Sequence, residues 1–140
     1  MMAPGSQTKP GGVLLAAVFA PKRETTAKQM EPQRELIWQG VNNEGVTCCI
    51  ARDQWERHVA KRPEIADALE LTARAMVAPE TVEPDKKHPV DEPGRKFRVL
   101  FVRAEGKREG YRLRVSVKHV RQPSGEWIKF YQSCWFVRAP

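Results

Sequence analysis

The segment from residue 111 to 118 alternates strictly between two kinds of side chain, and this alternation limits the fold more than any other feature. The odd positions are apolar or aromatic: Tyr111, Leu113, Val115 and Val117. The even positions are polar or basic: Arg112, Arg114, Ser116 and Lys118. A period of two sends the two sets to opposite faces of a β-strand. Residues 111–121 are therefore predicted to form a strand with one buried face and one basic face.

A second strand is predicted at residues 127–137, and the turn between the two strands sets their register. The turn Gln122-Pro123-Ser124-Gly125 has proline at its second position, as four-residue turns often do. This loop length pairs Arg121 with Glu126, Lys118 with Lys129, Ser116 with Tyr131, and Arg114 with Ser133. In that register Ile128, Phe130, Cys134 and Phe136 face the core, and Gln132 is the one exception to the pattern. The polar faces coincide, so one outer face is predicted to carry Arg112, Arg114, Ser116, Lys118, Trp127, Lys129, Tyr131, Ser133 and Trp135.

The rest of the chain predicts a small α+β domain. Two strand-like runs at 35–39 and 46–50 flank a turn at 42–45, which indicates a hairpin. Asp53 and Glu56 match a capping box for a helix ending at Lys61, and Pro63 suits the first turn of a second helix that ends before Pro79. A proline-rich loop at 79–95 and a strand at 97–103 follow. The expected fold is α+β, with an N-terminal hairpin and two helices packed on a C-terminal antiparallel β-sheet. Residues 1–30 are predicted to be a disordered tail and residues 31–140 the domain.

The charge is concentrated in the last third of the chain. Residues 95–140 contain 12 basic and 3 acidic residues, a net charge of +9, whereas residues 1–94 have a net charge of −2. A concentrated positive field favours polyanionic partners, although a solvated basic surface would give the same composition.

Cysteine usage and the absence of familiar motifs limit the remaining possibilities. The three cysteines, Cys48, Cys49 and Cys134, form neither a disulfide framework nor a CxxC zinc motif, and predict reduced thiols in a cytoplasmic protein. The apolar run at 13–20 is too short to span a membrane, and Pro21 argues against the alternative of a signal peptide. No metal-ligand cluster and no glycine-rich phosphate loop is present, so we expect neither a cofactor nor metal-dependent nuclease chemistry.

A motif on the first helix suggests a site for phosphate chemistry. The pattern is Trp55-x-x-His58-x-x-x-Arg62-Pro63-Glu64, and His58 and Arg62 are four residues apart on one helix face. Histidine suits proton transfer near neutral pH, and a guanidinium binds phosphate. A histidine on a helix is more often structural, which leaves a purely structural role open.

The motif, followed by a helix, a proline-containing loop and three strands, resembles a known group of domains. These are the phage and mobile-element domains grouped with barnase, EndoU, colicin and RelE-like ribonucleases, and the resemblance covers residues 35–138. It implies N-terminal helices packed on an antiparallel sheet, and a metal-independent ribonuclease that often acts as a toxin. His58 and Arg62 match the family's polar helix residues, and Lys118 matches a polar residue ending a central strand. Ser133 stands where the last strand often carries a Thr-x-Tyr-like motif, but it is not a direct match, and Tyr131 precedes it.

Three functions follow as hypotheses. The first is an endoribonuclease in which the 2′-hydroxyl of RNA is the nucleophile, with catalytic residues His58, Arg62, Lys118 and Ser133. Its RNA-binding residues would be Arg112, Arg114, Ser116, Lys129, Tyr131 and Trp135, and its partners RNA and an acidic antitoxin or immunity protein, with no membrane. The second is a non-catalytic nucleic-acid-binding module of a phage or mobile element. The third is a protein-interaction domain that uses exposed tryptophans.

Overall fold

The computed structural model describes residues 34–140, so the predicted tail at residues 1–30 and the apolar run at 13–20 lie outside the described residues. The elements in chain order are β1 (Leu36–Val41), β2 (Thr47–Ala51), α1 (Arg52–Lys61), a 3-10 helix (Pro63–Ile65), α2 (Leu69–Val77), β3 (Thr81–Pro84), β4 (Arg95–Arg103), a 3-10 helix (Gly106–Arg108), β5 (Tyr111–Arg121) and β6 (Trp127–Arg138). No helix among residues 34–140 is long and apolar enough to cross a membrane.

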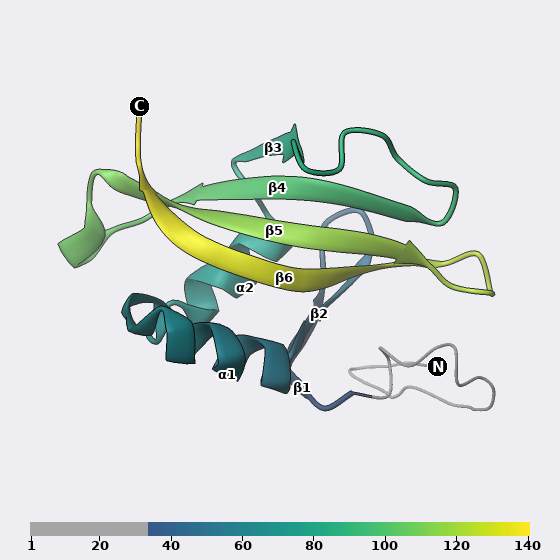
Figure 1. Ribbon diagram of the computed structural model, residues 1–140, viewed down its shortest axis with the longest axis horizontal. Helices are drawn as coiled ribbons and strands as arrows, with labels where there is room; N and C mark the ends of the chain where they lie inside the picture. The colour runs from purple at the N-terminus through teal and green to yellow at the C-terminus, as the bar shows by residue number, and fades with distance from the viewer. Residues whose placement is uncertain (1–33) are drawn as a thin grey trace. The chain divides into compact units, whose positions relative to one another are not determined.

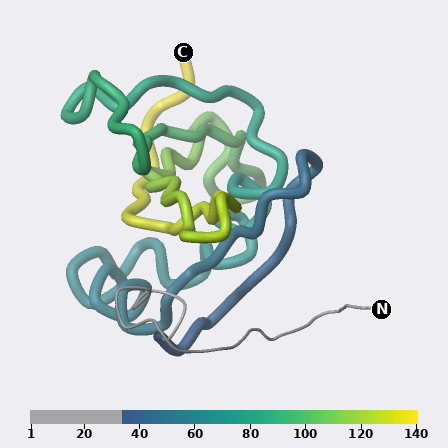
Figure 2. The backbone as a smooth tube through the Cα atoms, turned by 90° about the vertical axis from the view of Figure 1, so that its right-hand side faces the viewer, coloured from purple at the N-terminus to yellow at the C-terminus, as the bar shows by residue number. Residues whose placement is uncertain are grey.

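Six strands form one mixed sheet in the order β1-β2-β6-β5-β4-β3. Neighbouring strands are antiparallel except β2 and β6, which pair in parallel over Thr47–Cys49 and Ile128–Phe130. Both helices lie on the same side of β4, β5 and β6 (Figure 1). Figure 2 shows the blue β1–β2 segment beside the yellow-green β5–β6 hairpin. The α+β class is confirmed. The sheet differs from the expected antiparallel one because the first hairpin joins it through the parallel pair.

The hydrophobic core fills the space between the two helices and one face of the sheet. Leu113, Val115 and Val117 are fully buried there, as the alternation in β5 predicts. They pack in one cluster with the helix residues Trp55 and Met76. Because successive side chains of a strand point to opposite faces, the basic positions of β5 lie on the face turned away from the helices.

The first elements and the proline-rich loop differ in detail from the prediction. Asp53 lies in the first turn of α1, and Ala51 occupies the N-cap position without a side-chain cap. The segment from Pro63 begins as a 3-10 turn, and α2 starts only at Leu69. Within the predicted loop, β3 pairs with β4. All four β3 residues are exposed, so no alternation marks this strand in the sequence.

The turn between β5 and β6 is one residue shorter than predicted, and this changes the register. The amide of Gln122 donates to the carbonyl oxygen of Glu126 at 2.7 Å, and Gly125 adopts a φ of 92°. This is a three-residue turn with glycine in the left-handed conformation. The strands then pair Arg121 with Trp127 and Lys118 with Phe130. An odd loop length reverses the faces of the strand that follows it.

Consequently, the predicted faces of the first half of β6 are wrong. Trp127, Lys129 and Tyr131 lie on the helix side of the sheet. Ile128 and Phe130, which are opposite Val120 and Lys118, lie on the other side. A β-bulge then follows, because Ser116 pairs with Ser133 while Val117 pairs with Tyr131, leaving Gln132 without a partner in β5. After the bulge the pairs are shifted by two residues from the prediction, with Ser116 opposite Ser133 and Arg114 opposite Trp135. A shift of two keeps the faces as expected: Ser133 and Trp135 turn away from the helices, Cys134 and Phe136 toward them.

Candidate active site and nucleic-acid interface

One face of α1 makes polar contacts with β6 at three successive turns. The residues that make them are spaced four apart, which places them on one helix face: Gln54, His58 and Arg62. The amide of Gln54 donates to the carbonyl oxygen of Gln132 at 2.7 Å. The Nδ1 atom of His58 lies 2.8 Å from the hydroxyl of Tyr131. The guanidinium of Arg62, just after the helix, lies 5.2 Å from the ring centre of Trp135. Together these contacts hold α1 along β6 from Tyr131 to Trp135.

The hydroxyl of Tyr131 links His58 to a chain of hydrogen bonds in the core. It donates to Sγ of Cys134 at 3.5 Å, and Sγ lies 3.7 Å from Oγ1 of Thr72. The Thr72 hydroxyl in turn donates to the carbonyl oxygen of Ala68 at 2.8 Å. A phenol has one proton, so a hydroxyl that donates to Cys134 must accept from His58. In this arrangement Nδ1 of His58 carries the proton and Nε2 the lone pair; in the other tautomer the phenol donates to Nδ1.

Burial and charge set the ionisation of these groups. The pKa of His58 is lowered, first by burial and then by the positive charges of Arg57, Lys61 and Arg62. His58 is therefore neutral at neutral pH and able to accept a proton. Burial, followed by the neighbouring Cys134, raises the pKa of Tyr131, so its phenol stays protonated. Tyr131 is thus suited to orienting His58 and not to exchanging protons with a substrate.

Trp135, on the face turned away from the helices, contacts the guanidinium groups of two arginines. Besides Arg62, the guanidinium of Arg114 lies 4.4 Å from the ring centre of Trp135. Arg114 also donates to the hydroxyl of Ser116 at 3.2 Å, and Ser116 is paired with Ser133. A guanidinium stacked on an aromatic ring keeps its N–H edge available for the oxygens of a phosphate. These contacts fix both guanidinium groups beside Trp135.

The structure gathers most of the predicted site residues into two groups. His58 contacts Tyr131 on the helix side of the sheet. Arg62, Trp135, Arg114 and Ser116 form the second group through the contacts above, and Ser133 shares the face of Ser116. Arg112 lies on the same face, where its guanidinium stacks 3.9 Å from the ring centre of Phe101. Lys118 is also on this face, further along β5 and opposite Phe130.

Two predicted RNA-binding residues lie elsewhere. Lys129 is only 4% exposed, and its ammonium donates to the carbonyl oxygen of Met76 at 2.9 Å, in the last turn of α2. Tyr131 is equally buried and meets His58 from the core side, so its ring does not stand on the outer face. The cause in both cases is the odd turn before β6. The expectation of exposed tryptophans is also wrong, since Trp38, Trp127 and Trp135 are partly buried and Trp55 is buried.

Sequence reasoning missed three residues of this arrangement: Gln54, Thr72 and Cys134. Gln54 had a usable signal, because it stands four residues before His58 on the same helix face. Thr72 and Cys134 gave no such signal, because a threonine and a cysteine at apolar positions are typical of an ordinary core.

No protein-family model, no curated protein and no solved structure matches this chain. Residues 34–140 contain no group of three or more His, Cys, Asp or Glu placed to hold a metal ion. What the site can do must therefore be judged from its own geometry and charge.

Proposed function

We propose that this chain binds RNA and cleaves it as a metal-independent endoribonuclease of the barnase–EndoU–colicin–RelE-like kind, with the hairpin and helices packed on the sheet as in that group. The observation that carries the proposal is the state of His58. It is a neutral imidazole whose Nδ1 is bound by Tyr131 and whose helix face also carries Arg62. A base fixed in one orientation beside a guanidinium suits phosphodiester cleavage.

In the proposed reaction the 2′-hydroxyl of the RNA is the nucleophile. Nε2 of His58 takes its proton as the 2′-oxygen forms a bond to phosphorus. The bond to the 5′-oxygen breaks, and the imidazolium returns the proton to that leaving oxygen. The products are a 2′,3′-cyclic phosphate and a 5′-hydroxyl. Arg62 and Arg114 stabilise the charge on the phosphate, to which Ser133 donates a hydrogen bond and Lys118 adds positive charge.

The proposed binding surface is the sheet face turned away from the helices, and it continues past Trp135 to Arg62 and His58 on the helix side. Arg112, Arg114 and Lys118 lie along β5, and Ser116 and Trp135 complete the surface. About four to six phosphate contacts by these residues and Arg62 would give a log–log salt slope of roughly −3 to −4. An acidic antitoxin or immunity protein in the cytoplasm would cover the same surface.

The test is cleavage of a labelled RNA oligonucleotide in EDTA by the wild type and His58→Gln. Loss of a general acid–base residue should lower the rate about 10²- to 10⁴-fold, while RNA affinity should stay within about threefold because the arginines are unchanged. His88→Gln is the matched control. His88 lies in the loop before β4, so this variant should cleave RNA at the wild-type rate. Equal rates for the wild type and His58→Gln would exclude His58 from the reaction.

A non-catalytic nucleic-acid-binding module is the second candidate, and the packing of His58 favours it. The ring of His58 lies edge-on to that of Tyr131, with 5.6 Å between centres, and Trp55 packs against the same tyrosine. These contacts stabilise the helix against the sheet whether or not cleavage occurs. Salt-dependent RNA binding by a wild type that does not cleave in EDTA would establish this second function.

A further inference from the structure

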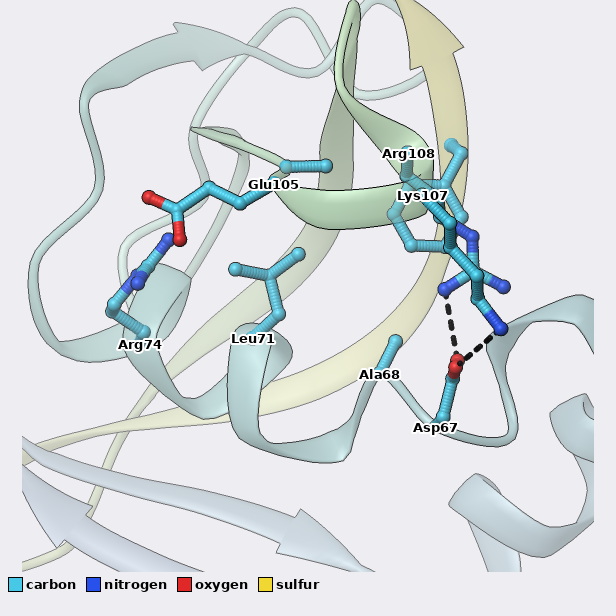
Figure 3. A pocket seen from close by; sticks show the side chains of 9 residues that line it. Asp67, Ala68, Leu71, Arg74, Glu105, Lys107 and Arg108 are labelled. Carbon is cyan, nitrogen blue, oxygen red and sulfur yellow. Dashed lines mark hydrogen bonds and ion pairs between the residues drawn. The ribbon is translucent and has the colours of Figure 1, made fainter.

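A pocket of about 240 Å³ lies between the start of α2 and the connection from β4 to β5. Its lining combines apolar and charged side chains: Asp67, Ala68, Leu71, Arg74, Ala104, Glu105, Lys107, Arg108 and Phe136. Figure 3 shows Leu71 in the middle, Arg74 and Glu105 on one side, and Asp67, Lys107 and Arg108 on the other. An apolar centre thus lies between two groups that each contain a hydrogen-bond donor and an acceptor.

Contacts within the wall hold these charged groups in place. The carboxylate of Asp67 accepts hydrogen bonds from Arg108 at 2.8 Å and from Lys107 at 3.3 Å. These bonds lower the pKa of Asp67, with Arg108 contributing most, so the carboxylate stays ionised. On the other side the guanidinium of Arg74 donates to the carbonyl oxygen of Arg103 at 3.3 Å. Side chains fixed in this way lose little freedom when a ligand binds.

The lining restricts the chemistry of a ligand. A free anion would meet the carboxylates of Asp67 and Glu105, and a free cation would meet three basic side chains. An apolar ligand would strip water from charged groups without replacing their hydrogen bonds. A neutral, flat molecule with apolar faces and polar edges meets none of these obstacles. The volume is below the roughly 300 Å³ at which pockets for drug-sized ligands begin, so a single small ring system fits best.

We propose that this pocket receives one nucleobase of a bound RNA strand, a proposal that rests on the RNA-binding function above. Bases present apolar faces together with edge donors and acceptors, and unpaired bases are the ones that proteins read in RNA. The pocket also lies near the end of α1, on the helix side of the sheet to which Phe136 turns. Arg108 donates to the carbonyl oxygen of Glu64, two residues beyond Arg62.

The first test uses free nucleosides, which carry no phosphate and so bypass the basic face. Adenosine, guanosine, cytidine and uridine are each titrated into the full chain, and the methyl signals of Ala68, Leu71 and Ala104 are followed by NMR. At least one nucleoside should give saturable shifts at these three residues, and Leu71→Trp should abolish the shifts at Ala68 and Ala104 by filling the pocket. Val41→Trp adds the same ring at an exposed site on β1 and should bind as the wild type does. Absence of saturable shifts for all four nucleosides overturns the proposal.

A second variant and an RNA measurement keep the two proposals distinguishable. Glu105→Gln changes only the rim, and should weaken nucleoside binding at least threefold even if Leu71→Trp does not fold. Among the four RNA homopolymers, the wild type should prefer one base at least tenfold, and Glu105→Gln should reduce that preference. Nucleoside binding without RNA binding or cleavage would support a base pocket while refuting the proposed function. RNA cleavage with no base preference and no methyl shifts would refute the pocket alone.

Discussion

Lys129 gives the sharpest test of the structure, because the sequence pattern and the fold assign it opposite roles. The alternation in β6 predicts a lysine on the RNA-binding face. In the structure its ammonium is buried and donates to the carbonyl oxygen of Met76, to which Sγ of Cys48 also bonds at 3.7 Å. That carbonyl belongs to the last turn of α2, where a positive charge interacts favourably with the negative end of the helix dipole. Lys129→Ala and Lys129→Met separate the contribution of the ammonium from that of the carbon chain.

The two variants should differ in stability by an amount that follows from these contacts. A hydrogen bond to a charged group contributes about 1.5–3 kcal/mol. Alanine also removes three buried methylenes, worth about 0.8 kcal/mol each. Neither variant buries a charge, which offsets part of the lost hydrogen bond. Lys129→Met keeps most of the buried chain and should cost no more than about 1–2 kcal/mol. Lys129→Ala also loses the methylenes and should lower the free energy of unfolding by about 3–4 kcal/mol.

Urea unfolding measures both changes, and RNA binding by Lys129→Met decides between the two roles. Its RNA affinity should stay within about twofold of the wild type, since the ammonium does not reach the outer face. Arg114→Met is the matched control on β5, where the same replacement should weaken RNA binding several-fold with little change in stability. A Lys129→Met protein that is as stable as the wild type but binds RNA as weakly as Arg114→Met would refute the buried position.

Three further predictions test the hydrogen-bond chain, the pH dependence and the faces of β5. Tyr131→Phe removes the hydroxyl that holds His58, so it should lower stability by about 1–3 kcal/mol and change the ¹⁵N shifts of the His58 ring in NMR spectra; an unchanged ring would exclude the link. The pKa of His119 is lowered to about 4 by burial and by nearby basic side chains, so unfolded protein binds more protons below pH 6.5. Stability should therefore fall between pH 6.5 and 4, by at most about 3 kcal/mol and by about 1–2 kcal/mol after allowance for solvent screening, and His119→Gln should flatten the fall in a melting series. Val115→Asp should unfold the domain, whereas Arg114→Glu should change stability by only about 0.5 kcal/mol and weaken RNA binding; the reverse result in melts and binding would mean that the faces are exchanged.

The parts of the fold that the sequence predicts correctly are those with a local physical signal. The burial of Leu113, Val115 and Val117 follows from period-two alternation, which any strand with one buried face must show. The apolar positions of α2 likewise repeat at helical spacing. Pairings between distant segments have no such signal. The parallel contact of β2 with β6 joins residues about 80 positions apart, and β3 depends on β4 for its hydrogen bonds while being exposed along its whole length.

The candidate site follows the same division. The spacing of His58 and Arg62 is visible in the sequence because four residues make about one helical turn. Their partners are not, because the contact with Tyr131 spans 73 residues and depends on the phase of β6. That phase depends on one residue of turn length, and a single step reverses every side chain. The exception at Gln132 was the visible sign that β6 changes phase within its length.

The two irregularities around β6 are what place its residues against α1. The odd turn sends Tyr131 to the helix side, where it meets His58, and the bulge at Gln132 then lets Ser133 face the opposite way in phase with Ser116. Because Gln132 is the inserted residue, its deletion leaves every other pair of β5 and β6 in phase, and the domain should still fold. The deletion does remove the carbonyl to which Gln54 donates, so α1 should lose one of its three contacts with β6 and RNA cleavage should fall at least tenfold. Deletion of Phe130 is the control, because closing the bulge then turns Tyr131 outward and puts Gln132 opposite the buried Val117, which should unfold the domain. If the Gln132 deletion unfolds the protein as completely as the Phe130 deletion in thermal melts, the bulge is part of the core pairing and the explanation of the site by an inserted residue is wrong.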